Sequence, residues 1–141
     1  MPTTDLPITS LSAPGDVDEG SSRPWLLFRV STGCVAALVV VQAVLAGGFL
    51  SGHYDALAAH AVIGGVAAAA MLLQTITSLV LWRKAAIPSW TVRVSLIQLI
   101  ITGALIVLGQ QRILGVHVPL AVLLTVGVAL SLLHAWRQGR R

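Results

Sequence analysis

The stretch LAAHAVIGGVAAAAMLLQTITSLVLW, residues 57–82, decides the fold of this chain. It contains no charged residue, and a helix of about 20 apolar residues is long enough to cross the hydrocarbon core of a bilayer. Three other stretches meet the same length requirement, so the predicted spans are about 25–50, 57–82, 88–110 and 115–136. The sequence therefore predicts an all-α integral membrane protein.

Composition agrees with this fold class. Of the 141 residues, 56% are hydrophobic and only 10% are charged, whereas a soluble domain carries about 25% charged residues. The net charge of +4 comes from basic residues beside the apolar stretches, so we expect a lipid bilayer and not a nucleic acid as the partner. Cys34 is the only cysteine, which excludes an internal disulfide and a covalently attached c-type haem.

Short connections between the spans force neighbouring helices to be antiparallel. We therefore predict an up-down-up-down four-helix bundle over residues 25–136. Residues 1–24 hold four of the five acids together with several Pro, Ser and Gly, a composition typical of a disordered tail. Residues 137–141 form a short basic tail.

The basic residues predict the orientation of the bundle. Eight of the nine belong to one side of the predicted bundle, and only Arg112 belongs to the other. The positive-inside rule then places both termini in the cytoplasm, and one tryptophan lies at the cytoplasmic end of each span. Eight arginines against one lysine, with abundant Ala, Val and Gly, hint at GC-rich coding DNA. We therefore expect a multi-pass protein of a bacterial cytoplasmic (inner) membrane.

Two histidines fall at the same predicted depth. His60 lies about one turn into the second span, and His117 opens the fourth span just before Pro119. These two spans run parallel and occupy diagonal corners of the bundle, so both histidines lie near its outer end. Small and polar residues on one stripe of a membrane helix face the protein interior. From His60 that stripe runs Gly64, Ala67, Met71, Gln74 and Ser78; from His117 it runs Ala121, Thr125, Val128 and Ser131.

This pattern indicates haem. Haem iron accepts two axial imidazoles, and Gly64 would leave room for the macrocycle beside His60. Arg112, the only basic residue on the outer side, would pair with the propionates. We therefore predict one bis-histidine haem b, ligated by His60 and His117. The protein would act in electron transfer or as an oxidoreductase component, with a quinone or a redox protein as partner.

The two motifs LAAHAVIGG, residues 57–65, and LGVHVPLA, residues 114–121, resemble one four-helix half of haem A synthase, or a small bacterial membrane b-type cytochrome. The resemblance implies haem held between His60 and His117. It also implies that a single bundle could homodimerise to form a comparable assembly. The acidic catalytic residue of that family has no clear counterpart, since Asp55 is the only outer acid. The resemblance therefore implies haem binding more than it implies the catalytic activity of that family, and whether the protein is an enzyme stays open.

Other interpretations remain. Both histidines could lie in the headgroup region or join helices, as in a cofactor-free accessory subunit packed through small residues. Gln42, Gln74 and Gln98 could form an interhelical network, or line a quinone pocket of a transport module. The outer His53 and Asp55 could join the pair in a zinc or copper site. We expect His134 to be an interfacial residue beside Trp136.

Overall fold

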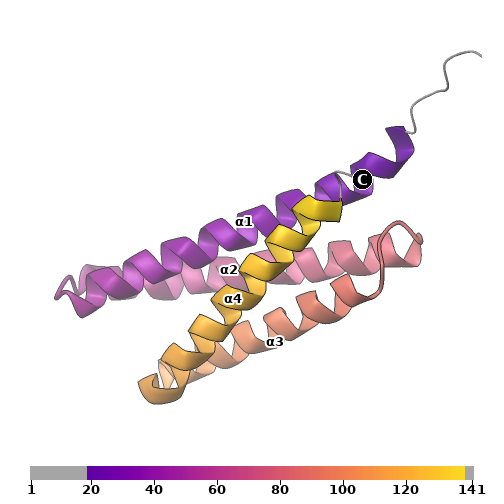
Figure 1. Ribbon diagram of the computed structural model, residues 1–141. Coiled ribbons are helices and arrows are strands. Elements are labelled where there is room, and N and C mark those ends of the chain that lie inside the picture. Colours follow the sequence, from indigo (N-terminus) through magenta and orange to yellow (C-terminus); the bar gives the residue numbers. More distant parts are fainter. Residues whose placement is uncertain (1–18, 139–141) are drawn as a thin grey trace, which may run out of the picture.

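A computed structural model describes residues 19–138. This part of the chain contains no strand and forms four helices, α1 (Glu19–Leu50), α2 (Asp55–Arg83), α3 (Trp90–Gln110) and α4 (Leu114–Gln138) (Figure 1). Each helix contains an apolar window long enough to cross a membrane. The predicted all-α fold is confirmed, and we describe the chain as a multi-pass membrane protein.

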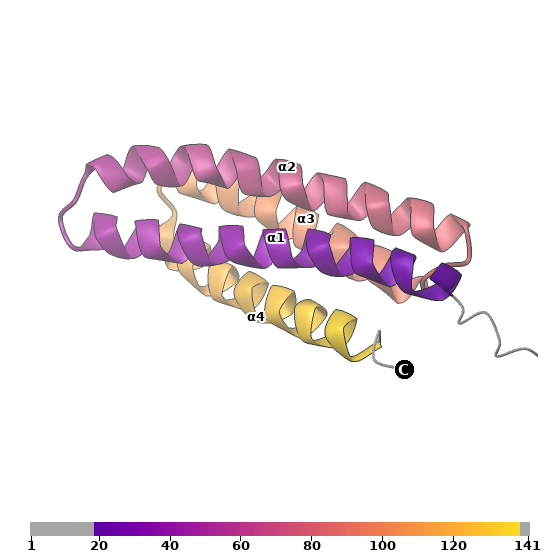
Figure 2. The same cartoon turned by 90° about the horizontal axis from the view of Figure 1, so that it is seen from above.

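The four helices form a ring. Helix α1 packs against α2 and α4, and α3 packs against the same two helices, while the backbones of the diagonal pairs α1–α3 and α2–α4 do not approach closely. Figure 2 shows α1 flanked by α2 on one side and by α4 on the other, with α3 behind. Helices α2 and α4 therefore occupy diagonal corners, as the sequence predicted.

Large apolar side chains cover the outside of the ring. Val44 is 68% exposed, Leu73 64% and Leu123 65%. Such a surface would be costly in water. It suits the hydrocarbon core of a bilayer, where lipid covers the outer faces of the helices and only their inner faces pack against protein.

The described chain differs from the predicted boundaries at its beginning. Helix α1 starts at Glu19 and contains Pro24, whereas the sequence analysis assigned residues 1–24 to a disordered tail. Pro24 lies beyond the first turn of α1, so its ring takes the place of a hydrogen bond to the Gly20 oxygen and weakens the ladder near the start of the helix. Residues 1–18 and 139–141, which hold most of both predicted tails, lie outside the described residues.

The two ends of the bundle differ in their loops. We call the end with loops 51–54 and 111–113 the histidine end, and the end with loop 84–89 the tryptophan end. In Figure 1 the α1–α2 and α3–α4 hairpins lie together at the tryptophan end and separate towards the histidine end. The hairpin turn at Gly52 (φ 94°) is closed by hydrogen bonds from His53 N to Gly48 O and from Gly52 N to Phe49 O, a Schellman motif.

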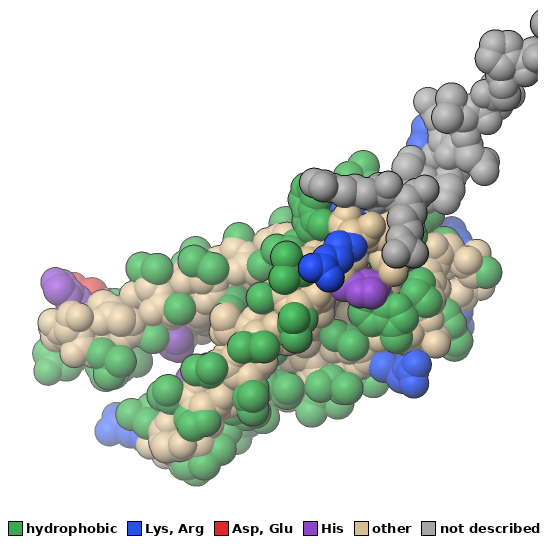
Figure 3. Space-filling view, in the orientation of Figure 1, with side chains coloured by type: hydrophobic (Ala, Val, Ile, Leu, Met, Phe, Trp, Pro, Cys, Tyr) green, Lys and Arg blue, Asp and Glu red, His purple; other side chains and the backbone are tan. Residues whose placement is uncertain are grey.

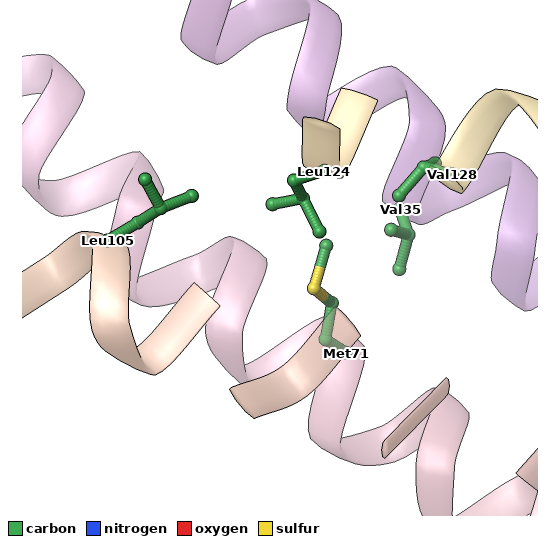
Figure 4. Close-up of a cluster of buried hydrophobic side chains, with 5 residues drawn as sticks. All are labelled: Val35, Met71, Leu105, Leu124 and Val128. Atoms are coloured by element: carbon green, nitrogen blue, oxygen red, sulfur yellow. The ribbon is translucent and has the colours of Figure 1, made fainter. Parts of the chain in front are cut away.

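Buried side chains form three layers. The tryptophan-end apolar cluster consists of Phe28, Leu81, Ile87 and Ala135. The middle apolar cluster consists of Val35, Met71, Leu105, Leu124 and Val128; Figure 4 shows the Met71 side chain directed at Leu124. Between the two, on all four helices, lies a polar layer made of Thr32, Gln74, Ser78, Thr91, Ser95, Gln98, Thr102 and Ser131.

The histidine end has no such layer. Past the middle apolar cluster, no residue of segments 36–66 or 106–123 is fully buried. The bundle therefore has a packed part and an unfilled part, and both histidines of interest lie in the unfilled part.

Candidate functional site

His60 and His117, on helices at diagonal corners of the ring, bring their imidazole rings close together. Their ring centroids are 6.4 Å apart and their planes are inclined by 53°, although the backbones of the helices that carry them do not approach closely. Both residues are half-buried. The space-filling view in Figure 3 shows the two hairpins apart at the histidine end, with histidine side chains along the inner part of the gap.

The neighbouring helix α1 fixes the position of His60. The His60 Nδ1 lies 3.2 Å from the backbone oxygen of Gln42, and the Gln42 side-chain Nε2 donates to the backbone oxygen of His60 at 3.0 Å. Two hydrogen bonds of opposite direction therefore clamp α1 against α2 at this residue. A carbonyl oxygen can only accept, so the His60 Nδ1 carries the proton.

The neighbouring helix α3 fixes His117 in the same way. Its Nδ1 lies 3.0 Å from the backbone oxygen of Leu105 and must likewise carry the proton. The ring lies against Gly109, where an added Cβ would come 3.3 Å from the His117 Cε1 and 3.4 Å from the Nδ1. Each histidine is thus held by the other helix of its own hairpin.

A glycine makes each approach possible. In a helix, residue i+4 donates its N–H to the carbonyl of residue i, so its side chain lies beside that oxygen. Leu105 has Gly109 at this position, and His60 has Gly64. At Gly64 an added Cβ would come 2.9 Å from the Gln42 Nε2. The incoming donors therefore occupy space that any larger residue would fill.

The geometry fits a shared metal. When a histidine donates from Nδ1, the neutral ring keeps the lone pair of Nε2 free, and metal-binding histidines commonly use this arrangement. Two imidazoles on opposite sides of one metal, at metal–nitrogen distances of about 2.0–2.1 Å, place their ring centroids roughly 6 Å apart. The observed separation of 6.4 Å meets that requirement, and no residue of the segments around the pair, 36–66 and 106–123, is fully buried.

The structure places the other predicted site residues as follows. Arg112 is exposed in loop 111–113 at the histidine end with a φ of 58°; its role towards propionates stays a prediction. The space left by Gly64, which the sequence analysis assigned to a macrocycle, accommodates the amide of Gln42. Among the described residues, no group of three or more His, Cys, Asp or Glu is arranged to hold a bare metal ion.

His134 lies at the opposite end from the pair. Its ring meets Trp90 of α3 edge to face at 4.4 Å, and its Nε2 lies 3.1 Å from the Gln138 Nε2. Trp136, two residues further on, lies under the guanidinium of Arg29 at 5.5 Å. His134 therefore packs between helices and is remote from His60.

The inward stripes are largely as predicted. Along α2, Ala67, Met71, Gln74 and Ser78 are buried. In α4, however, the buried position is Leu124 and not the predicted Thr125, which is exposed. The Thr125 hydroxyl donates to the Ala121 oxygen of its own helix.

The glutamines join helices in the interior. Gln74 Nε2 donates to Ser95 Oγ at 3.2 Å, and Gln98 Nε2 donates to Ser131 Oγ at 3.0 Å. These bonds match the predicted interhelical network. Gln42, the third glutamine, contacts the candidate site itself.

Sequence reasoning missed the roles of Gln42 and Gly109. Their contacts depend on the register between neighbouring helices, which the sequence of a single helix does not give. The spacing of Gly64 from His60 is visible in the sequence, whereas its pairing with Gln42 is not.

Comparison with family models, with curated proteins and with solved structures finds no significant match. The case for a function therefore depends on the geometry of the histidine pair, and the resemblance to haem A synthase stays a prediction.

Proposed function

We propose that this protein binds one haem b, with His60 and His117 as the two axial ligands, and that it takes part in electron transfer. One observation carries the proposal: two imidazoles on diagonal helices lie 6.4 Å apart, and each donates from its Nδ1 to a backbone carbonyl of a neighbouring helix. This is the separation, and the choice of nitrogen, that bis-imidazole ligation needs.

Each hairpin supplies one of the two proposed ligands. The α1–α2 hairpin presents His60, and the α3–α4 hairpin presents His117. Because each ring is oriented within its own hairpin, the two ligands can approach a flat group from opposite faces without contact between α2 and α4. Haem, when bound, supplies one-electron oxidation and reduction of its iron.

Ligation by both histidines favours electron transfer over catalysis at the metal. With two protein ligands on the axial positions, no position stays open for a substrate. The chain would then pass electrons to or from a quinone or a redox protein, alone or as a component of an oxidoreductase. A second copy of the bundle could complete a homodimeric assembly.

The distribution of basic residues supports an orientation for this site. Arg83 and Lys84 lie in the tryptophan-end loop, whereas the histidine end has Arg112 alone. The positive-inside rule then assigns both termini to the cytoplasm of a bacterial inner membrane and the haem to the outer leaflet.

Titration of purified protein in detergent with haemin tests the proposal. We expect a Soret band that saturates at one haem per chain, and its loss in the double variant His60→Ala/His117→Ala. The variants His53→Ala and His134→Ala serve as matched controls and should keep the band. A chain without a Soret band would make the protein a cofactor-free subunit, and a band that survives the double variant would place the haem elsewhere.

A further inference from the structure

The polar layer contains two amide oxygens without a partner. Gln74 and Gln98 are 1% and 3% exposed, and the Oε1 atom of each is buried and accepts no hydrogen bond from any described residue. Both side chains already use their Nε2 as a donor to a serine. The polar layer therefore contains two acceptors that lack a hydrogen-bond donor.

The serine protons fix this assignment. Ser131 Oγ donates to the backbone oxygen of Gly127 at 2.8 Å, so it can only accept from Gln98. Ser78 Oγ donates to the backbone oxygen of Gln74 at 2.9 Å, which leaves Ser95 to donate to Ser78 and to accept from Gln74. With every hydroxyl proton used, neither amide oxygen can find a donor among these neighbours.

Leaving such an oxygen bare is costly. A buried polar atom without a hydrogen bond costs roughly 1–3 kcal/mol, and lipid around the bundle offers no substitute donor. Buried polar atoms of this kind are normally satisfied by internal water. Two bare amide oxygens in one layer therefore point to bound molecules.

The surroundings restrict what can bind. Because the free groups are acceptors, an oxidised quinone, which offers only acceptors of its own, does not satisfy them. A cation lacks a counter-charge, since Asp55 is the only acid beyond residue 19 and it lies exposed at the start of α2. The middle apolar cluster and the tryptophan-end apolar cluster close the layer on both sides. The occupant must be small, neutral and a donor.

We propose that the polar layer binds internal water, with the Oε1 atoms of Gln74 and Gln98 as acceptors. The site is independent of the haem proposal, because the middle apolar cluster separates it from the histidine pair.

Water-edited solid-state NMR of the full chain in lipid bilayers tests this inference. We expect magnetisation from water to reach Gln74, Gln98 and Ser131 several-fold faster than Val35 and Val128, which are equally buried in the middle apolar cluster. Equal and slow transfer at all five residues would overturn the proposal.

A substitution supplies a second readout that does not depend on the dynamics of transfer. Gln98→Met keeps the approximate size and removes the acceptor, so the transfer at Ser131 should fall to the level of Val128 while that at Gln74 persists. An unchanged signal at Ser131 would show that Gln98 does not hold the water. If Gln98→Met does not fold, the single-residue comparison in the unmodified chain still decides.

Discussion

From Phe28 to Val35, helix α1 buries a side chain at each turn, whereas from Ala36 to Leu50 the same helix buries none. The other helices change in the same way where they pass the middle apolar cluster. In the packed part, apolar and polar side chains fill the interior between all four helices. In the histidine end, glycines and two imidazoles take their place.

We expect the packed part to determine the stability of the bundle and the histidine end to determine haem binding. The packed part supplies buried area and interhelical hydrogen bonds, so it holds the bundle together. The histidine end buries fewer side chains, and its hydrogen bonds orient the two imidazoles. Substitutions should therefore affect folding in one part and haem binding in the other.

Met71→Ala should have the largest effect on folding. Met71 is 1% exposed in the middle apolar cluster, so truncation leaves a cavity there, while the Thr102 hydroxyl loses the sulfur as an acceptor and keeps the Gln98 oxygen. We expect a loss of about 2–5 kcal/mol in the free energy of unfolding, measured by denaturation in mixed micelles. His60→Ala in the haem-free protein should lose much less. Equal losses at the two positions would contradict the division between the two parts.

His117→Ala should have the largest effect on haem affinity. Removing one axial ligand leaves His60 alone, and we expect haem to bind on the order of 100-fold more weakly, about 2.7 kcal/mol. Haemin titration followed at the Soret band measures this, and circular dichroism checks that the helices persist. An unchanged affinity would remove His117 from the ligand set.

Gly109→Ala tests how His117 is positioned. The new Cβ would lie 3.3 Å from the ring, so the imidazole must move by a few tenths of an ångström, which disturbs its hydrogen bond to the Leu105 oxygen. Loss of such an orienting contact costs about 10-fold or more in metal affinity, and we expect that loss in the haem titration. Gly103→Ala is the matched control, because an added Cβ there meets nothing within 4 Å. Equal effects of the two substitutions would show that the contact has no role.

Gly64→Ala should act through Gln42. Its Cβ would come 2.9 Å from the Gln42 Nε2 and would displace the hydrogen bond to the His60 oxygen, at a cost of about 1 kcal/mol in unfolding free energy. Gly65→Ala, with open space around its Cβ, should be neutral or slightly stabilising. If Gly65→Ala destabilised the bundle as much, general helix packing and not the Gln42 clamp would be the cause.

Arg112→Gly should have the smallest effect of these substitutions. It should lower haem affinity without lowering the stability of the haem-free bundle. Arg112 has a φ of 58°, which glycine adopts without steric cost, so the haem-free bundle should be no less stable. A lost propionate partner would weaken haem binding several-fold in low salt. Equal haem affinity of the variant and the unmodified chain would remove Arg112 from the site.

Much of this architecture was predictable because it depends on periodicity. The four spans follow from hydrophobicity and length, and the inward stripe of α2 follows from the spacing of Met71, Gln74 and Ser78. The diagonal placement of His60 and His117 follows from short connections alone. The start of α1 at Glu19 was not predicted, because the acids, Pro, Ser and Gly of residues 1–24 are typical of a disordered tail.

The contacts that orient the histidines were not predictable. Gln42 and His60 meet only because α1 and α2 pack in one register, and His117 reaches the Leu105 oxygen only because Gly109 lies against it. Such pairings depend on the rotation and offset of two helices. A shift of one residue, like the one that exposes Thr125, would break them without changing the composition of any span.

The spin and ligation state of the ferric protein tests the central claim most directly. Electron paramagnetic resonance of haem-loaded protein, together with near-infrared magnetic circular dichroism, distinguishes two imidazole ligands from any other pair. We predict a low-spin, bis-imidazole signal from one haem per chain, converted to a high-spin signal by either His60→Ala or His117→Ala. A high-spin signal from the unmodified chain, or a bis-imidazole signal that persists in either variant, would contradict the account.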